Sequence, residues 1–285
     1  MTDTNSPVPY RSIPTAAQFY DLVVGVGRRR FRVPSFFRPG CGGPSILFVH
    51  GLGGSKENFY AALQHPALAD CAVASFDLPG SGRSSFDPTA GIDVTVLAEL
   101  TQSVANALFP EPYFLAGASM GGLISLLLIR RYGVNRLRGF INIEGNLAPE
   151  DCMFSRRVVA HPAESFGPLF RQMMVELERS PHVGDRIIAQ HMAFNLDPRA
   201  YHAYSFKTVQ ESDSGRLLED FLALELPRTL IYGEVNRGLS YLPRLRASAV
   251  EVIEIPGSAH FVFYDNPVAT YQAIGDFTHR PSEKP

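Results

Sequence analysis

A serine stands at a tight turn between a predicted strand and a predicted helix. The turn, Gly117-Ala118-Ser119-Met120-Gly121, follows the apolar run 113–116 and precedes the apolar run 123–129. Such a turn strains its central residue, and small neighbours let the strand and the helix approach closely. The hydroxyl is then exposed at a helix N-terminus, where backbone N–H groups favour developing negative charge. Ser119 is therefore predicted to be a nucleophile.

A serine hydroxyl is barely acidic, so it needs a base within hydrogen-bond reach, and that base is usually histidine. His260 follows a predicted strand at 250–255 and a short turn at 256–259. A loop after a parallel strand lies at the same edge of the sheet as the turn that carries Ser119. His260 is therefore predicted to be the general base.

Acyl chemistry at Ser119 would also need two donors for an oxyanion. One predicted donor is the backbone N–H of Met120, directly after the nucleophile. The second is the backbone N–H of Leu52, in a glycine-rich loop at 50–54 that follows the predicted strand 45–49. His50 in this loop could be a rival base, but we expect it to order the loop through hydrogen bonds.

The rest of the pattern alternates between strands and helices. Continuous apolar runs predict buried strands, and helical spacing of apolar residues predicts helices between them. This order indicates an α/β fold with a mostly parallel sheet covered by helices on both faces. Strands are expected at 19–33 (a pair), 45–49, 72–76, 113–116, 137–143, 229–232 and 250–255, and helices at 94–108, 123–132 and 268–277.

The alternation stops over residues 147–226, where prolines divide short helical patches. About 80 residues exceed what an ordinary crossover needs, so this segment is predicted to be an inserted helical cap. The core then comprises residues 16–146 and 227–280, and residues 1–15 form a loose N-terminal arm. The cap supplies aromatic and methionine side chains suited to an apolar pocket or to packing: Phe154, Phe166, Phe170, Met173, Met174, Met192, Phe194, Tyr201, Tyr204 and Phe206.

Composition excludes several classes of function. The 285 residues carry a net charge of −2, which gives no electrostatic reason to bind nucleic acid. No apolar run approaches the length of a membrane span, and the first residues do not resemble a signal peptide, so a cytoplasmic protein is expected. Three cysteines are too few and too scattered to predict a disulfide framework or a zinc site.

Four motifs, in order, resemble those of the α/β-hydrolase fold family. His50-Gly51 resembles its oxyanion motif, and residues 77–84, Asp-Leu-Pro-Gly-Ser-Gly-Arg-Ser, resemble its D-x-P-G-x-G-x-S loop. Residues 117–121 resemble its nucleophile elbow, and residues 257–261 its histidine region. The resemblance, which runs from about residue 19 to 277, implies a capped hydrolase core with a catalytic triad at the carboxyl edge of the sheet.

The chain departs from that family where the acid of the triad usually stands. The family carries a Gly-x-x-Asp pattern after the strand at 229–232, but this chain has Asn236 at the aspartate position. Glu144, at the end of the strand 137–143, is our prediction for the acid, because certain haloalkane dehalogenases of this family place a glutamate there. An unpaired charge would also be costly in such an apolar segment. Glu234, Asp151 and the absence of a functional acid are the alternatives.

The residues together predict a serine hydrolase that forms an acyl-enzyme. The expected partner is a small-molecule substrate, namely a small to medium, largely apolar ester, thioester or lactone, and neither a cofactor nor a metal is expected to take part. Serine at the elbow argues against epoxide hydrolase and dehalogenase chemistry, which need a carboxylate there. Hydrolysis of a C–C or amide bond, peroxidase-like activity and a non-catalytic ligand-binding protein stay open, as does the oligomeric state.

Overall fold

The strands form one sheet in a computed structural model that describes residues 16–162 and 165–280. The predicted N-terminal arm, 1–15, lies outside the described residues. The sheet has eight strands in the order β1-β2-β4-β3-β5-β6-β7-β8. β2 pairs antiparallel with β1 and β4, and all other neighbours from β4 to β8 are parallel. The strands are β1 Gln18–Val26, β2 Arg29–Arg38, β3 Ser45–Val49, β4 Ala72–Phe76, β5 Tyr113–Ala118, β6 Leu137–Ile143, β7 Arg228–Gly233 and β8 Glu251–Ile255.

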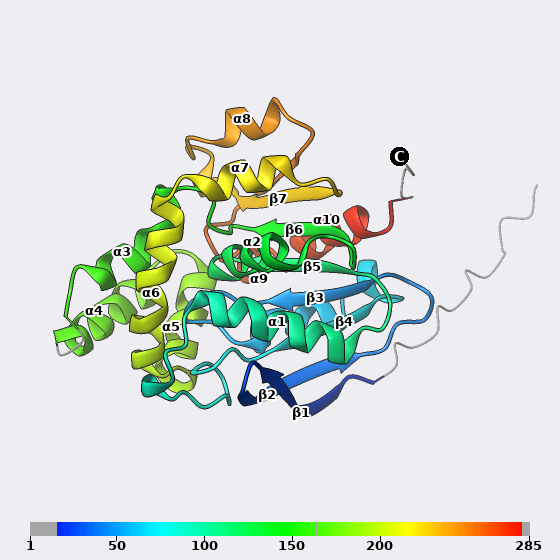
Figure 1. Cartoon of the computed structure of the whole chain (residues 1–285). Helices are drawn as coiled ribbons and strands as arrows, with labels where there is room; N and C mark the ends of the chain where they lie inside the picture. The colour runs from blue at the N-terminus through cyan, green and yellow to red at the C-terminus, as the bar shows by residue number, and fades with distance from the viewer. Residues whose placement is uncertain (1–15, 163–164, 281–285) are drawn as a thin grey trace, which may run out of the picture.

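Helices cover both faces of this sheet (Figure 1). α1, α2, α7 and α8 contribute to one apolar core, while α9 and α10 contribute to the other. The predicted α/β class with a mostly parallel sheet is therefore confirmed. The helices are α1 Val94–Leu108, α2 Met120–Tyr132, α3 Met153–Val159, α4 Phe166–Glu178, α5 Val183–Asn195, α6 Pro198–Asp213, α7 Arg216–Ala223, α8 Leu242–Arg246, α9 Val262–Asp265 and α10 Pro267–Thr278.

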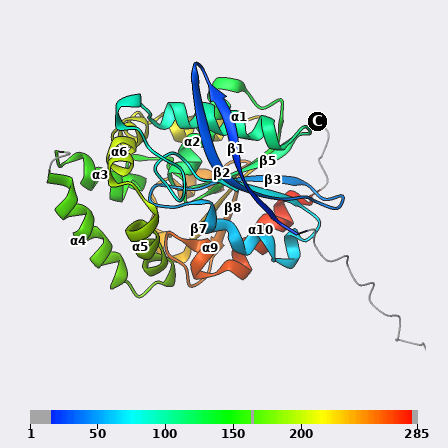
Figure 2. The ribbon, with the colours of Figure 1, turned by 90° about the horizontal axis from the view of Figure 1, so that it is seen from below.

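The segment from 147 to 226 contains five of these helices. α3, α4, α5 and α6 lie beyond the carboxyl ends of the parallel strands, on the left in Figure 1. α7 instead packs against α2 on a face of the sheet. β1 and β8 are the two edge strands of the sheet. Figure 2 shows the β1–β2 hairpin in front of the rest of the sheet, and the exposed arginines 28–30 lie at its turn.

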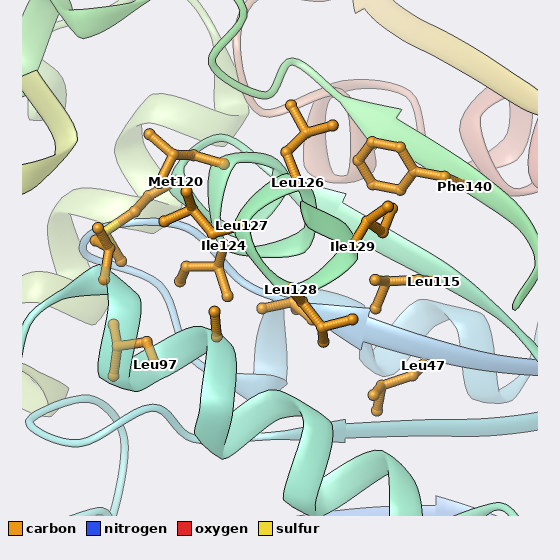
Figure 3. Packing of buried hydrophobic residues seen from close by; sticks show 14 of the residues in the cluster. Leu47, Leu97, Leu115, Met120, Ile124, Leu126, Leu127, Leu128, Ile129 and Phe140 are labelled. Carbon is orange, nitrogen blue, oxygen red and sulfur yellow. The ribbon is translucent and has the colours of Figure 1, made fainter. Parts of the chain in front are cut away.

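The core around α2 fixes the position of the turn that carries Ser119. Every residue of β5 is buried, and so is α2 from Met120 to Ile129. Figure 3 shows these α2 side chains packed between Leu97 of α1 and Phe140 of β6. Buried apolar surface stabilises the folded state by about 25 cal/mol per Å². The extensive burial of β5 and α2 therefore holds this strand–helix unit firmly in place. Among the described residues, no helix is long and apolar enough to cross a membrane.

A buried ion pair fixes the loops that follow β3 and β4. Lys56 Nζ lies 2.8 Å from Asp77 Oδ2, and the two side chains are 6% and 0% exposed. Asp77 also accepts hydrogen bonds from the backbone N–H groups of Lys56 (2.9 Å) and Arg83 (3.0 Å). One carboxylate therefore ties together the loop at 50–56 and the loop at 77–84.

We expect Asp77→Asn to lower the free energy of unfolding by about 3–5 kcal/mol, because it leaves the Lys56 ammonium buried without its counter-charge. Urea unfolding followed by circular dichroism would measure the change. The matched control is Asp21→Asn, which breaks an exposed pair with Arg32 and should cost less than about 1 kcal/mol. Equal losses in the two variants would contradict this account of Asp77.

Candidate functional site

Two adjacent strands are each followed directly by a residue with a positive φ angle. Ser119, after β5, has φ of 52°, and Glu144, after β6, has φ of 50°. They are the non-glycine residues with positive φ in the described part of the chain, and this conformation is costly for a residue with a Cβ. Each amide continues the parallel ladder: Ser119 N donates to Ile143 O (3.0 Å) and Glu144 N to Ile231 O (2.9 Å). Both side chains thus leave the sheet at its carboxyl edge.

The glycines around Ser119 allow the close packing that the sequence predicted. A Cβ on Gly121 would lie 2.2 Å from the carbonyl oxygen of Val49, and one on Gly117 would lie 2.4 Å from that of Gly121. Neither backbone atom can move away easily, because both belong to buried elements. The start of α2 is therefore held against β3, and the hydroxyl of Ser119 stays half-buried at the helix N-terminus.

The loop after β8 brings His260 to the carboxylate of Glu144. His260 Nδ1 lies 3.3 Å from Glu144 Oε2, and the two side chains are 13% and 6% exposed. Because a carboxylate is an acceptor, Nδ1 carries the proton in this hydrogen bond and Nε2 is left to act as an acceptor. His260 and Ser119 line the same two small cavities.

Glu144 has two further hydrogen-bond donors, from the last residue of β7 and from the turn that follows it. The amide of Gly233 donates to Oε1 at 2.6 Å, and Asn236 Nδ2 donates to Oε2 at 2.9 Å. Asn236 occupies the position at which the sequence suggested a missing acid. In the structure its side-chain amide instead donates a hydrogen bond to the carboxylate of Glu144.

Burial acts to lower the pKa of His260, but the hydrogen bond and charge of Glu144, with a smaller contribution from Asp151, raise it above the ordinary value of 6.5. A raised pKa means that the site favours the imidazolium form. Such a site would stabilise the cation that a general base becomes after it accepts a proton.

The two alternative acids contact other groups. Asp151 Oδ2 accepts from the amides of Leu147 and Ala148 (both 2.8 Å), and its Oδ1 accepts from Tyr241 Oη (3.0 Å). Burial, opposed by these hydrogen bonds, raises the pKa of Asp151 to about 6. Glu234 Oε2 accepts from the amide of Gly257 at 2.8 Å. In the described residues, the carboxylate within hydrogen-bond distance of His260 is that of Glu144.

The two residues predicted to supply oxyanion donors both lie beside Ser119. Met120 is the first residue of α2, so its N–H has no acceptor within the helix. Leu52, Met120 and Ser119 line one cavity. The neighbouring Gly51 approaches the nucleophile closely, since a Cβ there would lie 2.7 Å from Ser119 Cβ. This approach requires glycine and explains the residue type.

The buried side chain of His50 holds the loop at 50–54 in place through hydrogen bonds. Its Nδ1 lies 2.8 Å from Gly51 O, and its Nε2 accepts from the amide of Leu78 at 3.0 Å. Burial lowers the pKa of His50 to about 4, so the ring is neutral near pH 7. Both nitrogens are therefore engaged in ordering the loop, as expected, and neither faces a reacting group.

The space beside Ser119 is small and is closed by α3 and α6. The two cavities have volumes of about 10 Å³ and about 20 Å³, which is room for about one water each. Phe154 and Ser155 of α3 line the larger cavity with Tyr201 and Thr208 of α6. Most of the other aromatic and methionine side chains of segment 147–226 pack in the apolar core, while Phe194 is 85% exposed.

Comparison with known proteins identifies relatives over most of the chain. Residues 46–273 match a family model described as the Alpha/beta hydrolase family. The chain is 30% identical over 159 residues to 2-succinyl-6-hydroxy-2,4-cyclohexadiene-1-carboxylate synthase of Yersinia pseudotuberculosis, which covers 55% of this chain and 54% of that protein. It is 40% identical over 88 residues to the dihydrolipoyllysine-residue acetyltransferase component of the acetoin cleaving system of Pseudomonas putida, or 30% of this chain and 23% of that protein. The match thus spans about half the length of the first of these relatives and about a quarter of the length of the second.

A similar solved structure is a thermophilic esterase from Thermogutta terrifontis. It has a TM-score of 0.73 and 22% sequence identity, and the match covers 91% of this chain and 97% of the esterase. This likeness supports the fold.

We expect an NMR titration to give His260 a pKa above 6.5 and Glu144→Gln to lower that pKa, because the amide removes both the charge and the carboxylate acceptor while burial continues to favour the neutral ring. The control is Glu234→Gln, the same change on a carboxylate that contacts Gly257 instead. An unchanged His260 titration in Glu144→Gln would contradict the pairing.

Proposed function

Since the chain belongs to the alpha/beta hydrolase family, we propose that it is a serine hydrolase that cleaves an ester, thioester or lactone bond through an acyl-enzyme. The observation that carries this proposal is the hydrogen bond between Glu144 and His260 beside the strained turn of Ser119. Ser119, His260 and Glu144 form the proposed triad, in which the acid follows β6 rather than β7.

The proposed reaction begins when His260 Nε2 takes the proton of Ser119 Oγ as that oxygen attacks the acyl carbon. The backbone N–H groups of Leu52 and Met120 hold the resulting oxyanion. The C–O or C–S bond breaks as the leaving group takes the proton from His260. A water molecule, deprotonated by His260, then attacks the acyl-enzyme, and the carboxylic acid leaves as the proton returns to Ser119.

Glu144 contributes to each of these steps through the ring of His260. Its carboxylate holds Nδ1 protonated, so that Nε2 is the nitrogen that accepts a proton. It also stabilises the imidazolium formed in both halves of the reaction. Asn236 and Gly233 fix the orientation of this carboxylate through their hydrogen bonds.

Asn236 at the usual acid position would favour a non-catalytic binding protein if the site had no other acid, because an amide cannot stabilise an imidazolium. In the structure the amide donates to Glu144, so its presence fits a hydrolase whose acid has moved to the neighbouring strand. The substitution therefore gives no support to the binding alternative.

The kinetic test uses p-nitrophenyl acetate and p-nitrophenyl butyrate. Glu144→Gln should reduce kcat roughly 10²- to 10⁴-fold, as a carboxylate-to-amide change at a triad acid does. Glu234→Gln is the matched control and should retain kcat. Ser119→Ala should remove the acyl-enzyme pathway. Small and equal losses in Glu144→Gln and Glu234→Gln would contradict the assignment of the acid.

The size of the substrate follows from how closely segment 147–226 covers the site. The Phe154 ring centroid lies 6.4 Å from that of His260, and the cavities beside Ser119 hold about one water each. An acyl group therefore displaces side chains of α3 or α6 when it binds. We propose that Phe154 limits the acyl chain.

Phe154→Ala should increase kcat/KM for p-nitrophenyl hexanoate relative to the acetate by roughly tenfold, because it opens space beside His260 for the longer chain. Steady-state kinetics on the ester series would measure the ratio. Phe194→Ala, which truncates an exposed ring of α5, should leave the ratio unchanged. An unchanged ratio in Phe154→Ala would exclude this role.

A further inference from the structure

A second group of reactive side chains lies at the opposite edge of the sheet from Ser119. Asp70 and Cys71 stand immediately before β4, and His279 follows α10. Their ligand atoms lie within 4.8 Å of one another. Asp70 and His279 border a hollow of about 440 Å³ that is also lined by Cys41 and Asp276, while Cys71 is fully buried. More than 200 residues of sequence separate His279 from the other two, so spacing along the chain could not reveal the group.

The three ligand atoms have the spacing of a zinc site. His279 Nε2 lies 3.0 Å from Asp70 Oδ1, Cys71 Sγ lies 3.8 Å from the same oxygen, and Sγ and Nε2 are 3.9 Å apart. In a tetrahedral zinc site the nitrogen and oxygen ligands are about 3.3 Å apart and the sulfur is about 3.6 Å from each. The observed distances differ from these values by only a few tenths of an ångström.

The ring of His279 is already oriented for a ligand at Nε2. Its Nδ1 lies 2.7 Å from the carbonyl oxygen of Gly275, so Nδ1 carries the proton and donates it to this bond. A backbone carbonyl on the far nitrogen is the usual support of a metal-binding histidine. Gly275 is itself held, since a Cβ there would lie 2.7 Å from Ala67.

A buried cation lies next to the backbone of Cys71. Arg38 is 1% exposed, and its guanidinium donates to the carbonyl oxygens of Leu63, Leu68 and Cys71. Burial and the charge of Asp70 raise the pKa of the Cys71 thiol to about 12, and the charge of Arg38 only partly opposes this shift, so a metal ion must displace the proton when it binds the sulfur.

We propose that Asp70, Cys71 and His279 bind one Zn²⁺ ion, with a water molecule from the hollow in the fourth position. A set of one sulfur, one nitrogen and one oxygen ligand suits zinc better than magnesium or calcium. The thiol releases its proton when the metal binds. The ion joins the loop before β4 to the end of α10, far from Ser119, so its role is structural.

A plain ion pair between His279 and Asp70 is the competing explanation. It accounts for the 3.0 Å contact between the two side chains, but gives no reason for the buried Cys71 sulfur to face the same point. The two explanations differ in whether the chain binds a metal with sulfur ligation.

The test titrates the full chain, stripped with a chelator, with Co²⁺ and then with Zn²⁺. We expect one Co²⁺ per chain with a sulfur-to-cobalt charge-transfer absorption, displaced by Zn²⁺, and a rise in Tm with Zn²⁺. Cys71→Ser should abolish the absorption. His279→Ala, an exposed change that preserves folding, should weaken Zn²⁺ binding at least tenfold.

Cys41→Ser is the matched control, because it replaces a thiol that lines the same hollow and leaves the side chains of the three proposed ligands unchanged. It should retain the absorption and the affinity for Zn²⁺. Absence of saturable binding in the wild-type chain, equal binding in wild type and His279→Ala, or loss of the absorption in Cys41→Ser would each overturn the proposed ligand set. None of these readouts depends on hydrolase activity.

Discussion

The carboxylate of Glu144, buried directly after β6, loses its hydration and must be stabilised by hydrogen bonds from the protein. The arrangement of the site depends on which groups supply these hydrogen bonds. The carboxylate of Glu144 accepts hydrogen bonds from two segments: the end of β7 and the turn after it, through the amide of Gly233 and Asn236, and the loop after β8, through His260. The free-energy cost of burying an isolated carboxylate is far larger than the stabilisation that any single hydrogen bond provides. The loops at the carboxyl edge are thus fixed around one negative charge.

The parallel sheet makes this meeting possible. β5, β6, β7 and β8 are successive neighbours, so their carboxyl ends lie in a row. The positive φ at Ser119 and at Glu144 turns each side chain out of the ladder after its strand ends. Strain at two adjacent positions is costly, and the buried packing of α2 against β3 and β5 holds it in place. The fold therefore supplies rigidity where the chemistry needs accurate positions.

The sequence predicted those parts of the molecule whose signals are local. The strands and α1 appear as apolar runs or periodic stretches, and the glycines around Ser119 indicate a close strand–helix contact. α6 was harder to predict, because its buried side includes Ser205 and Thr208, whose hydroxyls bond to backbone carbonyls four residues earlier. The donor role of Asn236 could not be predicted either. In the sequence, an amide at the usual acid position indicates only that the acid is missing, and the contact with Glu144 is visible only in the structure.

Labelling with a fluorophosphonate followed by peptide mapping tests the central claim most directly, since the probe reacts with a serine that a histidine base has activated. The account predicts one label per chain, on Ser119, and markedly slower labelling of Glu144→Gln than of Glu234→Gln. A folded protein that stays unlabelled at Ser119 would contradict the account, as would labelling that is equally fast in both variants.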